Sequence, residues 1–290
     1  MSQAPTIYLG FERRPHQQAV HLALKERRFA VAVMHRRAGK TAGAISELVE
    51  GALETKRPAA RFGYLAPSYA QAKRIAWDSE WGVKKFTSQI PGVSYHETEL
   101  RVDFPSGARI QLGGAENIDA WRGVYWDGVV IDEPAQIDGR FWPEIIRPAL
   151  SDRLGWALFI GTPQGEDYFY ELFVRARSGQ DPEWSAHLYR WSDTNQLLPG
   201  EVESARRMMS EEAFSREYEC SFTAGIDGAH YARLMDAVDR DGRVQTIRYD
   251  ARYPAVSAWD LGFGDATAIW IAQQVGGEVR ILRYLEDRGQ

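Results

Sequence analysis

Apolar residues form continuous runs of strand length at four places in the first 165 residues. The runs are 29–34 (FAVAVM), 61–66 (RFGYLA), 128–133 (GVVIDE) and 156–161 (WALFIG). Runs without alternating polar residues are typical of strands that are covered on both faces, as in a parallel sheet. Helix-like segments follow most of these runs. The pattern therefore predicts an α/β fold in which helices cover both faces of a parallel sheet.

Helices are predicted over 22–28, over 42–53 and over 69–81. The second of these carries Ala44, Leu48 and Ala52 at fourfold spacing, which places them on one helix face. Two alternating runs around a Pro-Ser-Gly turn, within residues 100–112, predict a β-hairpin.

The last third of the chain changes in character. Residues 199–222 are helical in pattern and charged, and Gly225, Asp227 and Gly228 then interrupt the helix. Three short strands are predicted after this break, over 255–261, 267–273 and 279–285. We therefore expect one domain over 1–198, a helical linker or lid over 199–225, and part of a second domain over 226–290.

Composition narrows the compartment and the class of partner. The chain has 290 residues, of which 44% are hydrophobic, enough for one large core or two ordinary ones. Its single cysteine, Cys220, excludes an intramolecular disulfide, and no N-terminal run resembles a signal peptide or a membrane span, so a reducing cytoplasm is expected.

The net charge of −5 argues against a nucleic-acid partner, but the charge is unevenly distributed. Residues 1–90 hold 15 Lys and Arg against 7 Asp and Glu, whereas residues 91–290 hold 20 against 33. A basic first third is compatible with contacts to polyphosphate or DNA. Solvated helix faces explain the same excess equally well.

The segment 33–41 (VMHRRAGKT) ends like a phosphate-binding loop. Gly39, Lys40 and Thr41 supply backbone N–H groups, an ammonium for phosphate oxygens and a hydroxyl for Mg²⁺, between a predicted strand and a predicted helix. Met34 occupies the place of the leading glycine, so the opening turn must form without a residue that readily adopts positive φ. A plain strand-to-helix turn is the alternative.

Two further strand ends carry residues suited to nucleotide chemistry. Asp132 and Glu133 end the third run, where one acid can hold Mg²⁺ and the other can activate water. Thr162, between Gly161 and Pro163, can sense the γ-phosphate at the neighbouring strand end. An ordinary surface turn and a tight Gly-Pro turn, respectively, are the alternatives.

Arg36 and Arg37 lie inside the loop segment. A guanidinium there can stabilise the charge that spreads over the γ-phosphate during hydrolysis. A solvated basic loop is the alternative for each arginine.

Asp260 lies within a predicted strand that is followed by a glycine turn and another strand. Such a carboxylate suits a two-metal nuclease that uses Mg²⁺ or Mn²⁺, but this chemistry needs several acids, and the sequence stops 30 residues later. Asp265 is expected to shape the turn. Glu286 and Asp287, just after the last predicted strand, are the nearby substitutes, and a polar strand end is their simpler interpretation.

The order of these motifs resembles that of the large terminase subunit of tailed bacteriophages, and the resemblance covers nearly the whole chain. Its pieces, in chain order, are Arg14-Pro15-His16-Gln17, the loop 35–41, Tyr64–Ser68 with Gln71–Lys73, Trp121-Arg122-Gly123, Val130–Gln136, Ile160–Pro163, Phe214–Tyr218 and Asp260. Arg14-Pro15-His16-Gln17 is similar to the family's Q motif, the loop 35–41 to its relaxed Walker A loop, and Tyr64–Ser68 with Gln71–Lys73 to its helicase-like segment. Trp121-Arg122-Gly123 resembles the approach to Walker B, and Val130–Gln136 resembles the Walker B strand. Ile160–Pro163 is similar to the coupling motif, Phe214–Tyr218 to the helix before the nuclease, and Asp260 to the first nuclease acid.

The resemblance implies a P-loop ATPase domain of the RecA/ASCE-like class, followed by the start of an RNase H-like nuclease domain. It implies adenine recognition by Arg14 and Gln17, and binding of ATP with Mg²⁺ by Ala38, Gly39, Lys40, Thr41, Asp132 and Thr162. Arg122 is a candidate for a finger donated to a neighbouring subunit. Double-stranded DNA, the portal protein of the procapsid and the small terminase subunit are the implied partners, and a homo-oligomeric ring is the implied assembly.

The implied location is the host cytoplasm, at the procapsid portal and not in the mature virion, with no membrane contact. Two other functions stay open: a helicase-like DNA-dependent ATPase, and an assembly protein that responds to nucleotide without turnover. DNA contacts are expected to be phosphate contacts without base specificity. Lys73, Arg74, Lys84 and Lys85 are candidates for them.

Overall fold

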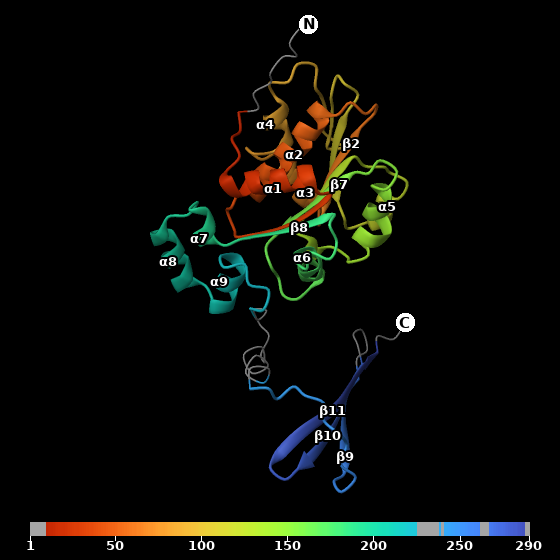
Figure 1. Ribbon diagram of the computed structural model, residues 1–290, viewed down its shortest axis with the longest axis vertical. Coiled ribbons are helices and arrows are strands. Elements are labelled where there is room, and N and C mark those ends of the chain that lie inside the picture. Colours follow the sequence, from red (N-terminus) through yellow and green to blue (C-terminus); the bar gives the residue numbers. More distant parts are fainter. Residues whose placement is uncertain (1–9, 225–237, 239–240, 262–266, 288–290) are drawn as a thin grey trace. The chain divides into compact units, whose positions relative to one another are not determined.

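The computed structural model describes residues 10–224, 238, 241–261 and 267–287, and the chain divides into two compact units, Met1–Ala229 and His230–Gln290 (Figure 1). The residues predicted to break the helix, Gly225, Asp227 and Gly228, lie outside the described residues, as does Asp265.

The first unit is built on one eight-stranded sheet whose strand order is β3-β4-β5-β2-β6-β7-β1-β8. The six strands from β5 to β8 in this order are parallel, and β4 and β3 extend one edge in antiparallel pairs. The parallel sheet predicted from the apolar runs is confirmed, and the predicted hairpin is formed by β4 and β5. The bounds are β1 (Phe29–Met34), β2 (Arg61–Ala66), β3 (Ser94–His96), β4 (Arg101–Asp103), β5 (Arg109–Gly114), β6 (Gly128–Asp132), β7 (Trp156–Gly161) and β8 (Trp184–Tyr189).

Helices cover both faces of this sheet, as predicted. One face packs against α1, α2, α3, η1 and α4, and the other against η2, η4 and α6. The bounds are α1 (Pro15–Glu26), α2 (Lys40–Glu54), α3 (Tyr69–Ala72), η1 (Lys73–Trp77), α4 (Val83–Thr87), η2 (Ile118–Trp121), η3 (Pro134–Gln136), η4 (Phe141–Ile146), α5 (Arg147–Ala149), α6 (Tyr168–Arg177), α7 (Trp191–Thr194), α8 (Pro199–Met208) and α9 (Glu211–Glu217).

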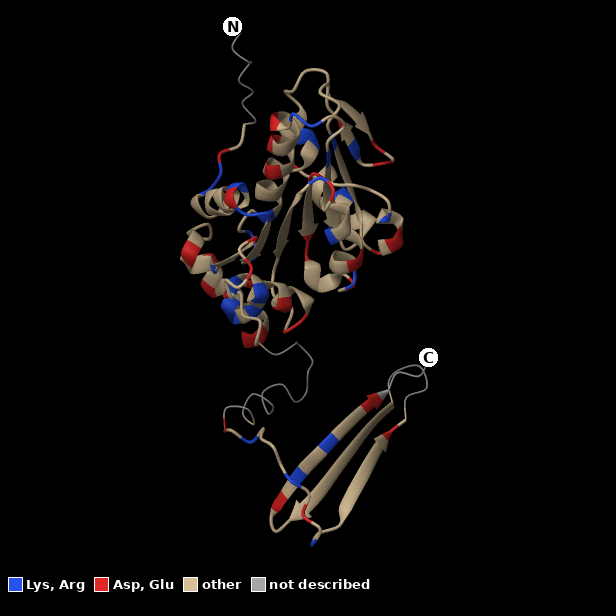
Figure 2. Ribbon diagram, turned by 45° about the vertical axis from the view of Figure 1, so that its right-hand side comes forward, with Lys and Arg blue, Asp and Glu red and all other residues tan. Residues whose placement is uncertain are grey.

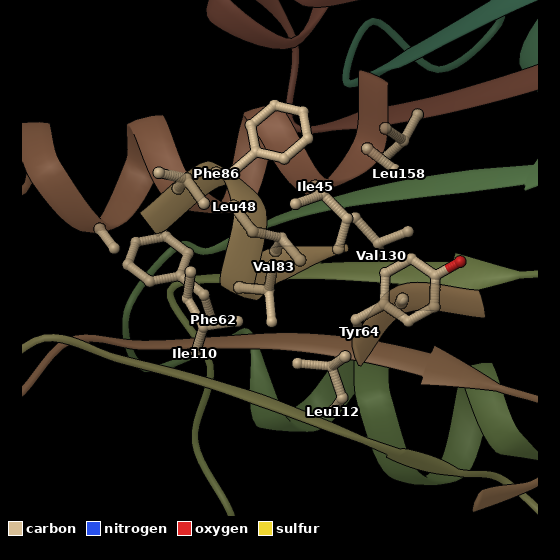
Figure 3. Close-up of a cluster of buried hydrophobic side chains, with 14 of the residues drawn as sticks. Ile45, Leu48, Phe62, Tyr64, Val83, Phe86, Ile110, Leu112, Val130 and Leu158 are labelled. Carbon is tan, nitrogen blue, oxygen red and sulfur yellow. The ribbon is translucent and has the colours of Figure 1, made fainter. Parts of the chain in front are cut away.

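Alternate side chains of each central strand enter two separate cores. On β1, Ala30 and Ala32 pack toward α2, whereas Val31 and Val33 pack toward α6. Figure 3 shows the first core, where Ile45 and Leu48 of α2 lie over side chains from β2, β5, β6 and β7. Burial on both faces explains why these strands have continuous apolar sequences.

Two predicted helices differ from the structure. The helix expected over 22–28 is α1, which begins at Pro15, because proline at the first helical position fixes φ and needs no N–H partner. The helix expected over 69–81 ends at Trp77, because the following chain folds back across its end. A Cβ at Gly82 would lie 2.7 Å from the Ala76 carbonyl oxygen. The sequence pattern also missed β8, an edge strand with an interrupted apolar run.

The second unit contains a three-stranded antiparallel sheet of order β11-β10-β9, formed by β9 (Ala255–Asp260), β10 (Thr267–Val275) and β11 (Glu278–Asp287). The three strands were predicted. Glu286 and Asp287 lie within β11 and not after it, because this strand pairs with β10 as far as Asp287 opposite Thr267. In the part of the chain that the structure describes, no helix is long and apolar enough to cross a membrane.

Candidate nucleotide site

The candidate nucleotide residues meet at the carboxyl edge of three adjacent strands. Strand β7 lies between β1, which leads into the loop, and β6, which ends at Asp132. Side chains that follow parallel strands gather at one edge of the sheet, where ligands commonly bind in open α/β folds. The strand order therefore brings together residues that are more than 120 positions apart in the sequence, such as Lys40 and Thr162.

The loop between β1 and α2 makes its turn with two left-handed residues. Met34 is buried at the end of β1, so the position expected to need glycine belongs to the strand. Arg37 has φ 69° and Gly39, the N-cap of α2, has φ 87°. The turn is thus built further along the loop than predicted, and its backbone N–H groups stand at the start of a 15-residue helix.

Lys40 is the first residue of α2, and its ammonium turns back over the loop. Nζ donates to Thr162 Oγ1 at 2.9 Å and to the Met34 carbonyl oxygen at 3.2 Å. The carboxylate of Glu133 lies 4.0 Å away. The lysine side chain is only 13% exposed, so its charge is held close to the loop by mostly neutral oxygens.

Asp132 ends β6 with its carboxylate buried. The hydroxyl of Tyr64, from the adjacent strand β2, donates to Asp132 Oδ2 at 2.6 Å. Burial raises the pKa of Tyr64, and the nearby Thr41 hydroxyl acts against that rise. Burial raises the pKa of Asp132, although the Tyr64 hydrogen bond and the Lys40 charge act in the opposite direction. Thr41 and Asp132, both predicted to hold Mg²⁺, are therefore both neighbours of one buried tyrosine.

Glu133 follows directly in the left-handed region, with φ 49° and ψ 60°. Its Oε2 accepts the backbone N–H of Thr162 at 3.1 Å. Burial raises the pKa of Glu133 to about 7, and the charges of Asp132 and Glu217 add to the rise, whereas Lys40 lowers it. An acid that titrates near neutrality can accept a proton from water. Thr162 therefore contacts both Lys40 and Glu133.

The first turn of helix α1 and its N-cap form hydrogen bonds with the backbone of the loop. Gln17 Nε2 donates to the Gly39 carbonyl oxygen at 2.9 Å, and Gln17 Oε1 accepts the Arg14 backbone N–H. His16 Nε2 lies 2.8 Å from the Ala38 carbonyl oxygen, to which Arg14 Nη1 also donates. Arg14 and Gln17, expected to recognise adenine, here bind the loop backbone.

Comparison with known proteins shows which family the chain belongs to. Residues 33–235 match the family described as "Terminase large subunit, T4likevirus-type, N-terminal". The chain belongs to the large terminase subunits of phages. This result agrees with the resemblance predicted from the order of the motifs.

Several relatives support the assignment. The chain is 27% identical to the terminase large subunit of Escherichia phage T5 over 83% of its own length and 55% of that protein, and 32% identical to that of Thermus virus P23-45 over 59% and 38%. It thus spans about half the length of the T5 protein and less of the other. The structure of the large terminase ATPase domain of Thermus phage P74-26 is 27% identical, covers 74% of this chain and 95% of its own, and has a TM-score of 0.62.

In this terminase chain, the loop also contacts the segment that follows β8. His35 is fully buried, with Nδ1 2.6 Å from the Arg36 carbonyl oxygen and Nε2 2.6 Å from Thr194 Oγ1. Burial lowers the pKa of His35 to about 4, so the ring is neutral at pH 7. Nδ1 then donates to the carbonyl, and the Thr194 hydroxyl donates to Nε2.

The three predicted arginines lie in different settings. Arg36 is 65% exposed, and its guanidinium lies 3.7 Å from the Glu217 carboxylate on α9. Arg37 is exposed on the turn itself. Arg122, after η2, pairs with Asp119 at 2.6 Å and with Glu144 at 3.7 Å.

The predicted basic candidates for DNA contacts are partly neutralised. Lys73 donates to Asp78 at 2.9 Å, and Lys84 lies 3.1 Å from the same carboxylate and 3.3 Å from Glu97. Figure 2 shows acidic and basic positions interspersed over the helices of the first unit. Such local pairing weakens the case for Lys73 and Lys84, which we predicted together with Arg74 and Lys85.

Asp260 of the second unit ends β9 and is exposed. In the register of the small sheet, Ala268 of β10 stands opposite Asp260 on one side and Glu286 on the other, so the two acids share a sheet face. In the described ranges, no group of three or more His, Cys, Asp or Glu is placed to hold a metal ion.

Four residues of the site were not among the predicted ones: His16, His35, Tyr64 and Thr194. His16, His35 and Tyr64 all lie inside motifs named above, and the contacts of the two histidines with the loop could be anticipated from their places next to it. Tyr64 reaches Asp132 only because β2 is next to β6, and Thr194 reaches His35 only because β8 is next to β1. No local pattern in the sequence indicates those contacts.

Proposed function

We propose that the first unit binds ATP with Mg²⁺, hydrolyses it, and drives translocation of double-stranded viral DNA into a procapsid. Membership of the large terminase family supports this function, as does the ATPase-domain description of the P74-26 structure. The observation that carries the proposal is the Lys40 ammonium at a helix N-terminus, bonded to neutral oxygens and 4.0 Å from Glu133.

The phosphates of ATP bind at the loop in this proposal. Backbone N–H groups at the start of α2 and the Lys40 ammonium both attract anions, and Lys40 can exchange its bond to the Met34 carbonyl for a phosphate oxygen. Ala38 and Gly39 supply the backbone of the cradle. Because Arg14 and Gln17 hold the carbonyls of these two residues, we propose that they set the loop as well as contact adenine.

Mg²⁺ fits the oxygen donors beside Lys40. Hard divalent cations prefer carboxylate and hydroxyl oxygens, and Mg²⁺ keeps waters and phosphate oxygens as further ligands. Asp132 is a desolvated carboxylate whose pKa is raised by burial, so a bound cation would stabilise its charged form, and Tyr64 donates a hydrogen bond to it. When bound, the ion neutralises charge on the β- and γ-phosphates.

Glu133 orients the attacking water and accepts its proton. Thr162 has two roles in this proposal. Its hydroxyl accepts a hydrogen bond from Lys40, and its backbone N–H donates one to Glu133 and so orients that carboxylate. When the γ-phosphate is lost, Lys40 exchanges hydrogen-bond partners. The hydrogen bond between Lys40 and Thr162 therefore depends on which nucleotide is bound. Arg36 or Arg37 stabilises the transferred phosphoryl charge in cis, and the exposed Arg122 is offered to a neighbouring subunit in a ring.

The complete protein also cuts concatemeric DNA in this proposal. Asp260 begins an RNase H-like metal site, with Mg²⁺ or Mn²⁺ as the ion, and Glu286 on the same face of the sheet is its nearest described acid. The partners are DNA, the portal protein and the small terminase subunit, in the host cytoplasm. DNA is held by salt-sensitive phosphate contacts.

The test is ATP binding and DNA-stimulated hydrolysis by the chain and three variants. Lys40→Ala is expected to lose ATP binding. Glu133→Gln is expected to bind ATP but to lose turnover by about 100-fold or more, in line with the loss of a general base. The matched control is Glu80→Gln, which removes an exposed acid and leaves turnover unchanged.

Hydrolysis that survives in Glu133→Gln would exclude the assigned role. ATP binding without DNA-stimulated turnover in the wild type, even with the portal complex present, would favour the assembly protein. Unwinding of a duplex in a strand-displacement assay would favour the helicase-like alternative.

A further inference from the structure

Arg13, the residue just before Arg14, is bonded to two carboxylates of α2. Its Nε donates to Glu47 Oε1 at 3.0 Å, and its Nη2 donates to Glu50 Oε2 at 2.6 Å. The two acids are three residues apart on α2 and therefore lie on one side of that helix. A planar guanidinium with two donors fixes a direction between them, which the single point charge of a lysine does not.

This ion-pair cluster is largely shielded from water. The side chains of Arg13, Glu47 and Glu50 are 15%, 9% and 22% exposed. Burial by itself raises the pKa of Glu50, but the hydrogen bond and charge of Arg13 lead the effects that hold that pKa below its ordinary value. His21 of α1 contacts the same acids, with Nδ1 2.9 Å from Glu47 Oε2. Because water and salt screen a buried pair little, the bridge holds Arg13 firmly against α2.

The segment that follows Arg13 is also fixed to the start of α2. Gln17 Nε2 donates to the carbonyl oxygen of Gly39, the N-cap of α2, and Gln17 Oε1 accepts the Arg14 backbone N–H. Gly39 and Glu47 are eight residues apart, which is about 12 Å along a helix. The two residues expected to recognise adenine are therefore held to α2 at two points, and two points fix the direction of the segment where one would let it pivot.

We infer that the two acids are positioning residues for adenine recognition and that they act through Arg13. The inference rests on the proposed function, because it needs adenine bound against Arg14 and Gln17. Without the bridge, the start of α1 is held by the loop and can pivot about it. The phosphates keep their site, because the loop carbonyls keep their bonds from His16 and Gln17. Loss of the bridge therefore weakens recognition of the base and spares binding of the phosphates.

The experiment measures the affinities of the full chain for ATP and for inorganic tripolyphosphate, each with Mg²⁺, by calorimetry. Arg13→Met is expected to bind ATP about three- to ten-fold more weakly, because the base site is no longer preorganised, and to bind tripolyphosphate within about twofold of the wild type. The double variant Glu47→Gln with Glu50→Gln should show the same split. Glu54→Gln is the matched control, since this acid of α2 pairs with Lys25 at 2.7 Å, and it should match the wild type for both ligands.

A triple variant combines Arg13→Met with both glutamine changes and serves where a smaller change unfolds the chain, because it leaves no carboxylate of the cluster unpaired. It should lose no more ATP affinity than Arg13→Met does, since the acids act through the arginine. Equal losses for ATP and tripolyphosphate, unchanged ATP affinity in Arg13→Met, or a further loss in the triple variant would overturn the inference. A wild type that binds neither ligand would instead refute the proposed function, so the two failures are distinguishable.

Discussion

Replacement of Glu133 by glutamine is expected to stabilise the nucleotide-free chain while it removes turnover. Burial, together with the charges of Asp132 and Glu217, raises the pKa of Glu133 from its ordinary 4.5 to about 7. The folded chain thus binds the Glu133 proton more tightly than the unfolded chain does. Ionising Glu133 in the fold costs free energy at every pH above its unfolded pKa.

The magnitude follows from the shift. Each tenfold change in proton affinity corresponds to about 1.4 kcal/mol, so the full cost is up to about 3 kcal/mol. Below pH 4.5 the acid is protonated in both states and the cost vanishes, whereas above pH 7 it is fully present. Glutamine cannot ionise but can still accept the Thr162 N–H, so the variant escapes the cost and keeps that hydrogen bond.

The assay is urea unfolding of the first unit, followed by tryptophan fluorescence in the presence of EDTA, at pH 8.5 and pH 5. Glu133→Gln is expected to exceed the wild type by about 2–3 kcal/mol at pH 8.5 and by less than about 1 kcal/mol at pH 5. Glu80→Gln, at an exposed position, controls for a general effect of net charge. Equal unfolding free energies at pH 8.5 would show that Glu133 is not destabilised in the fold.

Three further variants test other parts of the structure. Tyr64→Phe removes the hydroxyl that donates to Asp132, so the unfolding free energy should fall by about 1–3 kcal/mol and half-maximal ATPase should need more Mg²⁺, which a titration of Mg²⁺ against rate would measure. Gly39→Ala places a Cβ 2.9 Å from Gln17 Nε2 at φ 87°, so ATP binding measured by calorimetry should weaken at least about tenfold, and unchanged affinity would contradict the assigned loop geometry. Asp260→Ala should leave ATP turnover unchanged, and plasmid cleavage by this chain should be negligible with or without it; robust cleavage that this substitution abolishes would mean that the described residues already hold a sufficient metal site.

The central sheet could be predicted because its strands are buried on both faces. Continuous apolar runs such as Ala30–Val33 have few other interpretations, and the loop and the acids at their ends follow from chain order. β8 escaped prediction because it is an edge strand whose sequence, WSAHLY, interrupts its apolar residues with polar ones. The early end of the helix after Tyr69 depends on the approach of Gly82 to Ala76, which no periodicity indicates.

Some residues of the candidate site could be predicted from sequence motifs, whereas others are brought to the site only by strand order and packing. Lys40, Thr41, Asp132 and Glu133 follow from the motifs because each needs only a strand before it. The tyrosine between Thr41 and Asp132 depends on strand order, which the sequence does not state. The role of Arg36 is harder still, because its partner Glu217 comes from a helix 181 positions away whose placement follows from packing.

The position of β7 between β1 and β6 determines how much room the chemistry has. Neighbouring strands lie about 4.8 Å apart, so the lysine-bearing loop and the acidic strand end are separated by about 10 Å of sheet. Were the two strands adjacent, the backbones that carry Lys40 and Glu133 would lie about 5 Å closer together. With one strand inserted, they remain 4.0 Å apart at their tips while their backbones stay apart. In the function proposed above, a phosphoryl group would enter by separating these two side-chain tips, while the sheet keeps its strand order.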